Sequence, residues 1–136
     1  MKHGIMYTDG GSRGNPGPAA SAAVLFSPSM QEIATATKFL GEATNNVAEY
    51  TAIIIGLERA HQEGITHLVV RMDSELAVRQ LNGQYRVKNP ELQKLFLEVH
   101  KRLSKFSKVS FTHIRREQNI EADALVNKVL DREERR

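Results

Sequence analysis

The hydrophobic and polar positions in the first third of the chain form patterns that are typical of β-strands. Three segments have this strand character: His3 to Asp9, Ala19 to Ser27, and Gln31 to Leu40. The turn-forming residues Ser27-Pro28-Ser29 separate the last two segments, so we predict a hairpin there. The chain therefore opens with a β-meander.

The pattern then changes to helical spacing. From Asn46 to Glu63 apolar side chains recur three or four positions apart, and Gly64 follows where this helix is expected to end. Thr66 to Met72 is predicted as a buried strand. Ser74 to Leu81 is predicted as a short helix, with Ser74 as its N-cap.

A longer amphipathic helix is expected to begin at Pro90, because proline suits the first turn of a helix. Its apolar stripe consists of Leu92, Leu95, Phe96, Val99 and Leu103. A strand is predicted from Lys108 to His113, and a last helix from about Ile120. Residues from about 131 to 136 are expected to form a frayed, charged tail.

The predicted order of elements, βββαβααβα, indicates an α/β fold with a mixed sheet covered by helices. The 136 residues suffice for one domain, which we assign to residues 1–136. Uninterrupted apolar runs, such as Ala52 to Ile55, are only a handful of residues long, far shorter than the ~20 residues that cross a bilayer, and the N-terminal residues do not form a secretory signal. We therefore expect a cytoplasmic protein without a membrane partner.

The chain has a formal net charge of +3, and its basic residues are concentrated in the second half. Between residues 86 and 108, seven lysines and arginines stand against two glutamates. Lys94, Lys101 and Lys105 lie opposite the apolar stripe of the predicted helix. Such a surface binds phosphate groups or is simply a solvated helix face, and the charge pattern alone does not decide between these interpretations.

The segment Gly10–Pro18 is rich in glycine, with the sequence Gly-Gly-Ser-Arg-Gly-Asn-Pro-Gly-Pro. It matches neither the dinucleotide-binding Gly-x-Gly-x-x-Gly pattern nor the phosphate loop of NTP-binding proteins. A loop of this composition connects two strands or binds a ligand. Its nine residues exceed what a tight hairpin needs, which favours a binding role.

Three of the four aspartates lie at junctions between predicted elements: Asp9 ends the first strand, Asp73 ends the fourth, and Asp123 lies near the start of the last helix. Aspartate also favours turns and helix starts for structural reasons, so none of the three is decisive singly. Glu49 lies in the first turn of the first helix, beside its core stripe. If these carboxylates converge, their charges require a cation, and a set of oxygen ligands without cysteine selects Mg²⁺ or Mn²⁺.

Four motifs in this order resemble type 1 ribonuclease H (ribonuclease HI). They are the segment Tyr7–Pro18, Thr44-Asn45-Asn46-x-x-Glu49, Asp73-Ser74, and His113 followed after nine residues by Asp123. The resemblance implies a ribonuclease H-like fold with a five-stranded mixed sheet flanked by helices. It also implies endonucleolytic hydrolysis of the RNA strand of RNA/DNA hybrids, largely independent of sequence, that leaves 5′-phosphate and 3′-hydroxyl ends.

The resemblance further implies a role for each matched residue. The metal-binding carboxylates are Asp9, Glu49, Asp73 and Asp123, and they would hold two Mg²⁺ ions, with Mn²⁺ as a substitute. The positions that contact the RNA strand and its 2′-hydroxyls are Gly11, Ser12, Asn15, Asn45 and Asn46. A pocket for a DNA phosphate is matched by Thr44 and Asn89. His113 would assist proton transfer or product departure, or Arg116 would hold the scissile phosphate in its place.

The chain departs from several members of that family, in which a long basic insertion rich in Trp and Lys precedes the basic helix. Here only Asn82 to Lys88 intervenes, and the chain has no tryptophan, so it resembles a compact branch. We expect a monomer with the hybrid as its partner and no obligate protein partner. Two alternatives are a non-catalytic hybrid-binding module of the same fold and a DNA strand-transfer enzyme, and the Thr44-Asn45-Asn46 segment argues against the second.

Overall fold

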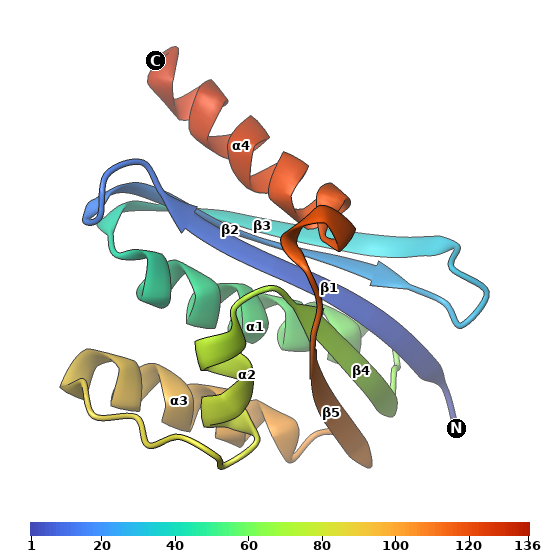
Figure 1. Ribbon diagram of the computed structural model, residues 1–136. Helices are drawn as coiled ribbons and strands as arrows, with labels where there is room; N and C mark the ends of the chain where they lie inside the picture. Colours follow the sequence, from blue (N-terminus) through green and yellow to red (C-terminus); the bar gives the residue numbers. More distant parts are fainter.

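The computed structural model describes all 136 residues. They form a five-stranded sheet and four α-helices (Figure 1). The strands are β1 (His3–Ser12), β2 (Gly17–Phe26), β3 (Glu32–Ala43), β4 (His67–Met72) and β5 (Lys108–His113). The helices are α1 (Asn45–Gln62), α2 (Glu75–Leu81), α3 (Pro90–Leu103) and α4 (Ile120–Glu134), with the short 3-10 helix η1 (Arg116–Gln118) before α4. The predicted order βββαβααβα is confirmed, as are the bounds of β5.

The strands lie in the spatial order β3-β2-β1-β4-β5. The three strands of the meander are antiparallel, whereas β1, β4 and β5 are parallel. Parallel neighbours need crossover connections, and these are supplied by α1 and then by α2 and α3. The mixed sheet and the ribonuclease H-like fold that the sequence predicts are therefore confirmed, and β1 occupies the centre of the sheet.

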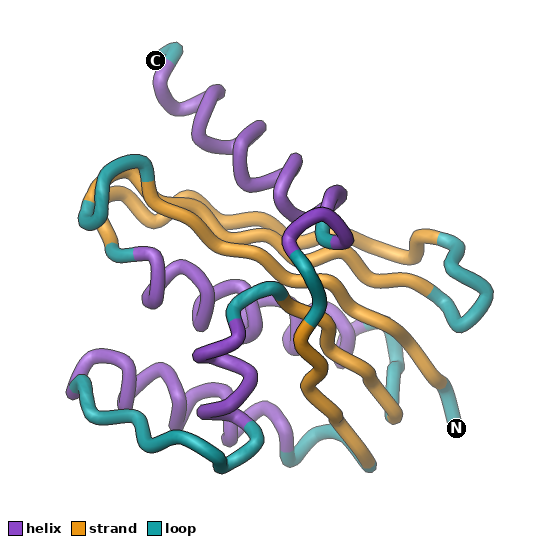
Figure 2. Tube along the Cα trace, in the orientation of Figure 1, coloured by secondary structure: helices purple, strands orange, loops and turns teal.

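The sheet is covered unequally on its two faces (Figures 1 and 2). On one face α1 packs on β1 and β2, and α3 packs on α1; on the other face α4 crosses β2. Alanines of β2 pack on both faces of the sheet. Ala23 packs in the core on the α1 side, while Ala20 and Ala22 pack against residues of α4. Small side chains on a central strand let both helices approach the backbone closely, which fixes α1 and α4 relative to β1.

N-caps form at all three helices on the α1 face, and the sequence predicts the one at Ser74. Thr44 accepts a hydrogen bond from the Val47 amide at the start of α1, and Ser74 caps α2 in the same way. Asn89 accepts bonds from two amides at the start of α3, directly before Pro90. These caps satisfy backbone donors that a helix start leaves without partners, and they fix the residues beside the sheet edge.

The prediction of a nine-residue glycine-rich loop is wrong. β1 continues through Ser12 and β2 begins at Gly17, so only residues 13–16 connect the two strands. Ser12 pairs with Ala19 in the antiparallel ladder. Glycine and serine carry little of the apolar alternation by which a strand is recognised, although their backbone groups pair normally.

The C-terminal segment also differs from the prediction. The sequence predicts fraying from about residue 131, yet α4 continues to Glu134. Arg13 forms ion pairs with Asp131 and Glu134, and these contacts tie the last turns of the helix to the β1–β2 connection. None of the helices combines the length and the apolarity that a bilayer crossing requires.

Candidate active site

The register of the central parallel strands brings two aspartates together. Thr8 of β1 is paired with Met72, the last residue of β4, so Asp9 and Asp73 are the next residues on neighbouring strands. Asp73 follows the end of β4 as predicted. Asp9, by contrast, lies inside β1 rather than at its end, because the strand continues beside β2 after its parallel partner has stopped.

Helix α1 adds the third carboxylate by lying directly on β1. A Cβ atom at Gly10 would overlap the backbone of Ala48 and Glu49, so only glycine allows this close approach. The Ser21 hydroxyl of β2 donates to the Ala48 carbonyl over 2.6 Å and fastens the same turn of α1. Glu49 is the fifth residue of α1, just past the first turn in which it is expected, because the helix begins at Asn45, one residue earlier than predicted.

Asp9, Glu49 and Asp73 form a compact cluster, in which one carboxylate oxygen from each lies within 4.8 Å of the others. Burial and the neighbouring charges of Asp73 and Asp123 raise the pKa of Asp9 to about 8. Burial, together with Asp9 and Asp73, also raises the pKa of Glu49 well above its usual value. The fold thus gathers carboxyl groups at a place where their ionised forms are unfavourable.

A cation would compensate for this cost. Glu49 Oε2 is buried and has no hydrogen-bond partner in the protein, as expected of an atom that binds a metal ion. Asp123 lies close enough to raise the pKa of Asp9 by its charge and by a hydrogen bond, and it lines the same pocket. Carboxylate oxygens are the donors that Mg²⁺ and Mn²⁺ prefer, so the residues present fit such an ion.

Asn119 is a residue of the site to which the sequence analysis assigns no role. It is fully buried at the start of α4, and its side-chain amide donates to the Thr8 carbonyl (2.9 Å) and to Asp73 Oδ2 (3.1 Å). An asparagine before a helix normally indicates an N-cap, but this side chain makes no capping bond. No sequence signal distinguishes an asparagine that orients a carboxylate from one that caps a helix.

The residues expected to contact RNA surround the carboxylates. Gly11, Ser12, Asn45 and Asn46 line the same pocket, which has a volume of about 460 Å³. The Ser12 amide donates to Asn45 Oδ1 over 2.8 Å, and the Asn45 amide donates to Asn15 Oδ1 over 3.0 Å. These bonds join the β1–β2 connection to the start of α1.

The two residues predicted to bind a DNA phosphate also come together. Thr44 and Asn89 line a second pocket of about 220 Å³, to which Asn15 and Asn46 contribute as well. Because Thr44 caps α1 and Asn89 caps α3, two helix N-termini meet at this pocket. Helix N-termini attract anions through their free amide groups and the helix dipole.

Comparison with known proteins supports this arrangement. A family model described as "Reverse transcriptase-like" matches residues 7–129. The crystal structure of RNase H1 from Halobacterium salinarum superimposes with a TM-score of 0.92 at 41% sequence identity, over 95% of this chain and 98% of that one. The chain belongs to the ribonuclease H family.

Two further solved structures support this assignment. The N-terminal RNase H domain of Rv2228c from Mycobacterium tuberculosis has a TM-score of 0.94 at 39% identity, over 96% of this chain and 95% of that one. LC11-RNase H1, solved in complex with an RNA/DNA hybrid, has a TM-score of 0.91 at 42% identity, over 95% and 97% of the two chains.

Among whole proteins, this chain corresponds to part of its relatives. It is 41% identical over 128 residues to the bifunctional protein Rv2228c of M. tuberculosis, spanning 93% of this chain but 35% of that protein. It is 42% identical over 125 residues to ribonuclease HI of H. salinarum, spanning 92% of this chain and 63% of that protein.

Within this ribonuclease H fold, the two candidates for assisting residues are placed differently. Arg116 lines the carboxylate pocket, and its positive charge counteracts the rise in the pKa of Glu49. His113 is exposed at the end of β5 and is not among the residues that line this pocket.

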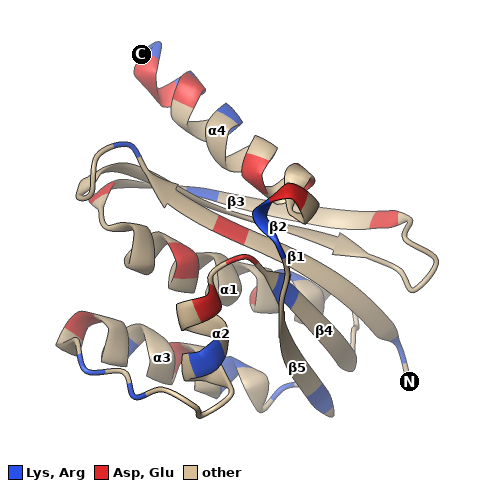
Figure 3. Cartoon of the chain, viewed as in Figure 1, with Lys and Arg blue, Asp and Glu red and all other residues tan.

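The predicted basic surface is spread along α3 (Figure 3). Lys101 and Lys105 line a cleft with the C-terminal half of α1, including His61. Because an α-helix rises about 1.5 Å per residue, His61 lies roughly 18 Å from Glu49 along the axis of α1. Lys94 is near the start of α3, the end that carries Asn89. In this ribonuclease H fold, Lys94 therefore lies at the end of α3 that carries Asn89, whereas Lys101 and Lys105 lie beside the half of α1 that is distant from Glu49.

Proposed function

We propose that this chain is an endoribonuclease that hydrolyses the RNA strand of RNA/DNA hybrids, leaving 5′-phosphate and 3′-hydroxyl ends with little dependence on sequence. The observation that carries the proposal is the convergence of Asp9, Glu49 and Asp73 to within 4.8 Å, in a pocket that also holds Ser12 and Asn45. A related protein of the same fold, LC11-RNase H1, has been solved with such a hybrid.

The four carboxylates, Asp9, Glu49, Asp73 and Asp123, would hold two Mg²⁺ ions or, in their place, Mn²⁺. Bound ions of this kind supply an activated water and stabilise the leaving oxygen of a phosphodiester. The protein's own contribution is to keep the ligands in place: Asn119 holds the Asp73 carboxylate, and the contact at Gly10 holds Glu49 against β1. Arg116 lines the pocket as a fixed positive charge for the scissile phosphate.

Selectivity for RNA would come from hydrogen bonds to 2′-hydroxyl groups. The side-chain oxygens of Asn15 and Asn45 accept hydrogen bonds from backbone amides, whereas their side-chain nitrogens have no partner in the chain. Both asparagines can therefore donate to the substrate without disturbing the loop. Gly11, Ser12 and Asn46 complete this group, which would read the minor groove by shape and by the 2′-hydroxyls rather than by base identity.

The second strand of the hybrid would be held by the pocket at Thr44 and Asn89. The oxygens of both side chains accept the capping bonds, so the Thr44 hydroxyl hydrogen and the Asn89 amide remain as donors. With the two helix N-termini, these donors suit a DNA phosphate.

The proposal is tested by incubating the protein in Mg²⁺ with labelled RNA/DNA hybrid, duplex DNA and duplex RNA of one sequence. We expect cleavage of the hybrid's RNA strand alone, with 3′-hydroxyl products that a polymerase extends. Binding of the hybrid without cleavage would instead identify a binding module, and cleavage of duplex DNA would indicate a DNA-processing enzyme. Either result would overturn the proposed activity.

A further inference from the structure

Arg13 joins two parts of the chain that are more than a hundred residues apart. Its guanidinium lies 2.8 Å from Asp131 Oδ1, 2.7 Å from Glu134 Oε1 and 3.2 Å from Asn127 Oδ1. All three partners belong to α4, at spacings that place them on one face of the helix. Arg13 itself lies in the short connection between β1 and β2 and lines the carboxylate pocket.

The same face of α4 carries a candidate metal ligand. Asn127 lies one turn after Asp123, and its side-chain nitrogen is 3.1 Å from the Asp123 carbonyl and 3.5 Å from Asp123 Oδ2. Asn127 thus accepts a hydrogen bond from Arg13 and donates to Asp123. A continuous polar chain leads from the guanidinium to the carboxylate.

The other side of Arg13 belongs to the predicted RNA-binding segment. The Arg13 amide donates to the Pro18 carbonyl over 2.8 Å, and the preceding Ser12 amide donates to Asn45. The backbone around Arg13 is therefore fixed to β2 and to α1, while its side chain is fixed to α4.

We propose that Arg13 is a positioning residue that holds α4, and with it Asp123, in register with the substrate-binding segment, so that binding of metal and binding of hybrid are coupled through this guanidinium. The inference rests on the proposed function, since it concerns the ligands and the substrate of that site. It assigns α4 beyond Asp123 a role in the site through the contacts of Asn127, Asp131 and Glu134.

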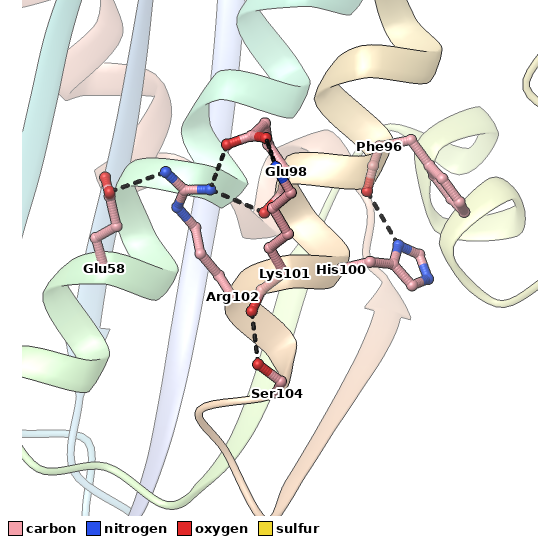
Figure 4. A network of polar contacts seen from close by, with 7 residues as sticks. All are labelled: Glu58, Phe96, Glu98, His100, Lys101, Arg102 and Ser104. Atoms are coloured by element: carbon pink, nitrogen blue, oxygen red, sulfur yellow. Dashed lines mark hydrogen bonds and ion pairs between the residues drawn. The ribbon is translucent and has the colours of Figure 1, made fainter.

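A second arginine of the same chain provides a matched control. Arg102 of α3 also pairs with two carboxylates, Glu58 on α1 and Glu98 on its own helix (Figure 4). The two arginine side chains have similar exposure, 33% for Arg13 and 26% for Arg102. The partners of Arg102 do not contact a carboxylate of the pocket. Its loss should therefore affect packing alone.

The test compares Arg13→Met with Arg102→Met, since methionine keeps much of the side-chain length but removes the charge. Mg²⁺ binding is measured by calorimetry without substrate, and kcat and KM for the hybrid are measured over a range of Mg²⁺ concentrations. For Arg13→Met we expect Mg²⁺ affinity to fall about 10-fold, the lower end of the effect of losing a direct partner of a metal ligand, because Arg13 reaches Asp123 through Asn127. We also expect a rise in KM. For Arg102→Met we expect a lower Tm, with Mg²⁺ affinity and KM unchanged.

A double variant, Asp131→Asn/Glu134→Gln, removes the same ion pairs while keeping Arg13. It replaces Arg13→Met in the test if that variant does not fold. It should reproduce part of the loss of Mg²⁺ affinity, and adding Arg13→Met should remove the remainder, which depends on the Arg13–Asn127 hydrogen bond. Unchanged Mg²⁺ affinity and KM in both variants would overturn the inference. Because Mg²⁺ binding is measured without hybrid, a wild-type protein that fails to cleave would refute the proposed function and still leave this coupling open to measurement.

Discussion

The two ends of α1 use charged residues in opposite ways. At the C-terminal end, Glu58 pairs with Arg102, which also binds Glu98, and Lys101 binds the other oxygen of Glu98 (Figure 4). At the N-terminal end, Glu49 lies among other carboxylates, and one of its buried oxygens has no partner. Charges that neutralise one another stabilise the packing of helices, whereas charges of one sign that are kept together by the fold indicate a binding site for a counter-ion.

The largest effect is expected from removing a charge at the uncompensated end. Asp73→Asn should reduce cleavage of the hybrid to the level of a metal-free reaction while hybrid binding survives, because the amide keeps the shape of the carboxylate but removes a charge that the cations need. Glu98→Gln removes one carboxylate at the compensated end and should leave turnover unchanged. Wild-type turnover by a folded Asp73→Asn protein would contradict the carboxylate assignment.

The next largest effect distinguishes Arg116 from His113. Arg116 lines the pocket and His113 does not, so we expect Arg116→Ala to lower kcat strongly at every pH. A proton-transfer role for His113 would instead give a loss of roughly 10²–10⁴-fold that depends on pH. The measurement is kcat against pH for both variants. If His113→Ala loses activity with an altered pH profile while Arg116→Ala stays close to wild type, the assignment of the phosphate contact to Arg116 is wrong.

The difference between the two ends also shows which features a sequence reveals. The apolar stripes, with Gly64 after α1 and Pro90 at the start of α3, predict these two helices well, because such signals depend on residues close together in the chain. The convergence of Asp9 with Asp73 depends on a register between strands that are far apart in sequence, and only the family resemblance indicates it. The role of Asn119 is not predicted, because its partners lie 111 and 46 positions away.

Two of the incorrect predictions, the glycine-rich loop and the frayed C-terminal tail, have the same physical origin. The sequence predicts a loop at Gly10 to Ser12 and fraying at residues 131–134 because neither segment shows an apolar pattern. In the structure β2 provides a strand partner for the first segment, and Arg13 provides ion-pair partners for the second. Polar segments are recognised as ordered only when their tertiary partners are known.

A smaller effect concerns stability and pH. The pKa of Asp9 is raised to about 8 in the folded protein, from 3.8, so the folded state binds more protons than the unfolded state between these values. Without metal, the free energy of unfolding should therefore fall as the pH rises from about 4 to about 8. Asp9→Asn should abolish much of this fall, and Mg²⁺ should raise Tm more at pH 8 than at pH 5.

Glu98, at the compensated end, serves as the control, because its ionisation makes the free energy of unfolding rise with pH instead of fall. Its hydrogen bonds with Lys101 and Arg102 lower its pKa, so the stability it contributes is lost only as the pH falls below its ordinary value of 4.5. Glu98→Gln should leave the change in stability between pH 5 and pH 8 as in the wild type, as measured by chemical unfolding in the presence of a metal chelator. A metal-free wild-type protein whose stability does not fall over that range would contradict the electrostatic account of the carboxylate cluster.

The smallest effect expected concerns the lysines of α3. Replacing Lys94, Lys101 and Lys105 together with glutamine should weaken the salt dependence of hybrid binding if these residues contact phosphates. The structure places Lys94 toward the end of α3 that carries Asn89 and the other two beside the distant half of α1, where Lys101 is already paired with Glu98.

We therefore expect Lys94→Gln alone to account for the whole change, a reduction of about 0.9 in the slope of log affinity against log salt for one lost phosphate contact. Lys101→Gln/Lys105→Gln removes twice the charge and should leave the slope as in the wild type. The measurement is equilibrium binding of hybrid to Asp73→Asn protein over a range of salt concentrations, so that cleavage does not interfere. If the double variant lowers the slope as well, the hybrid extends along α3 to the compensated end, and the contrast between the two ends of α1 does not hold for substrate binding.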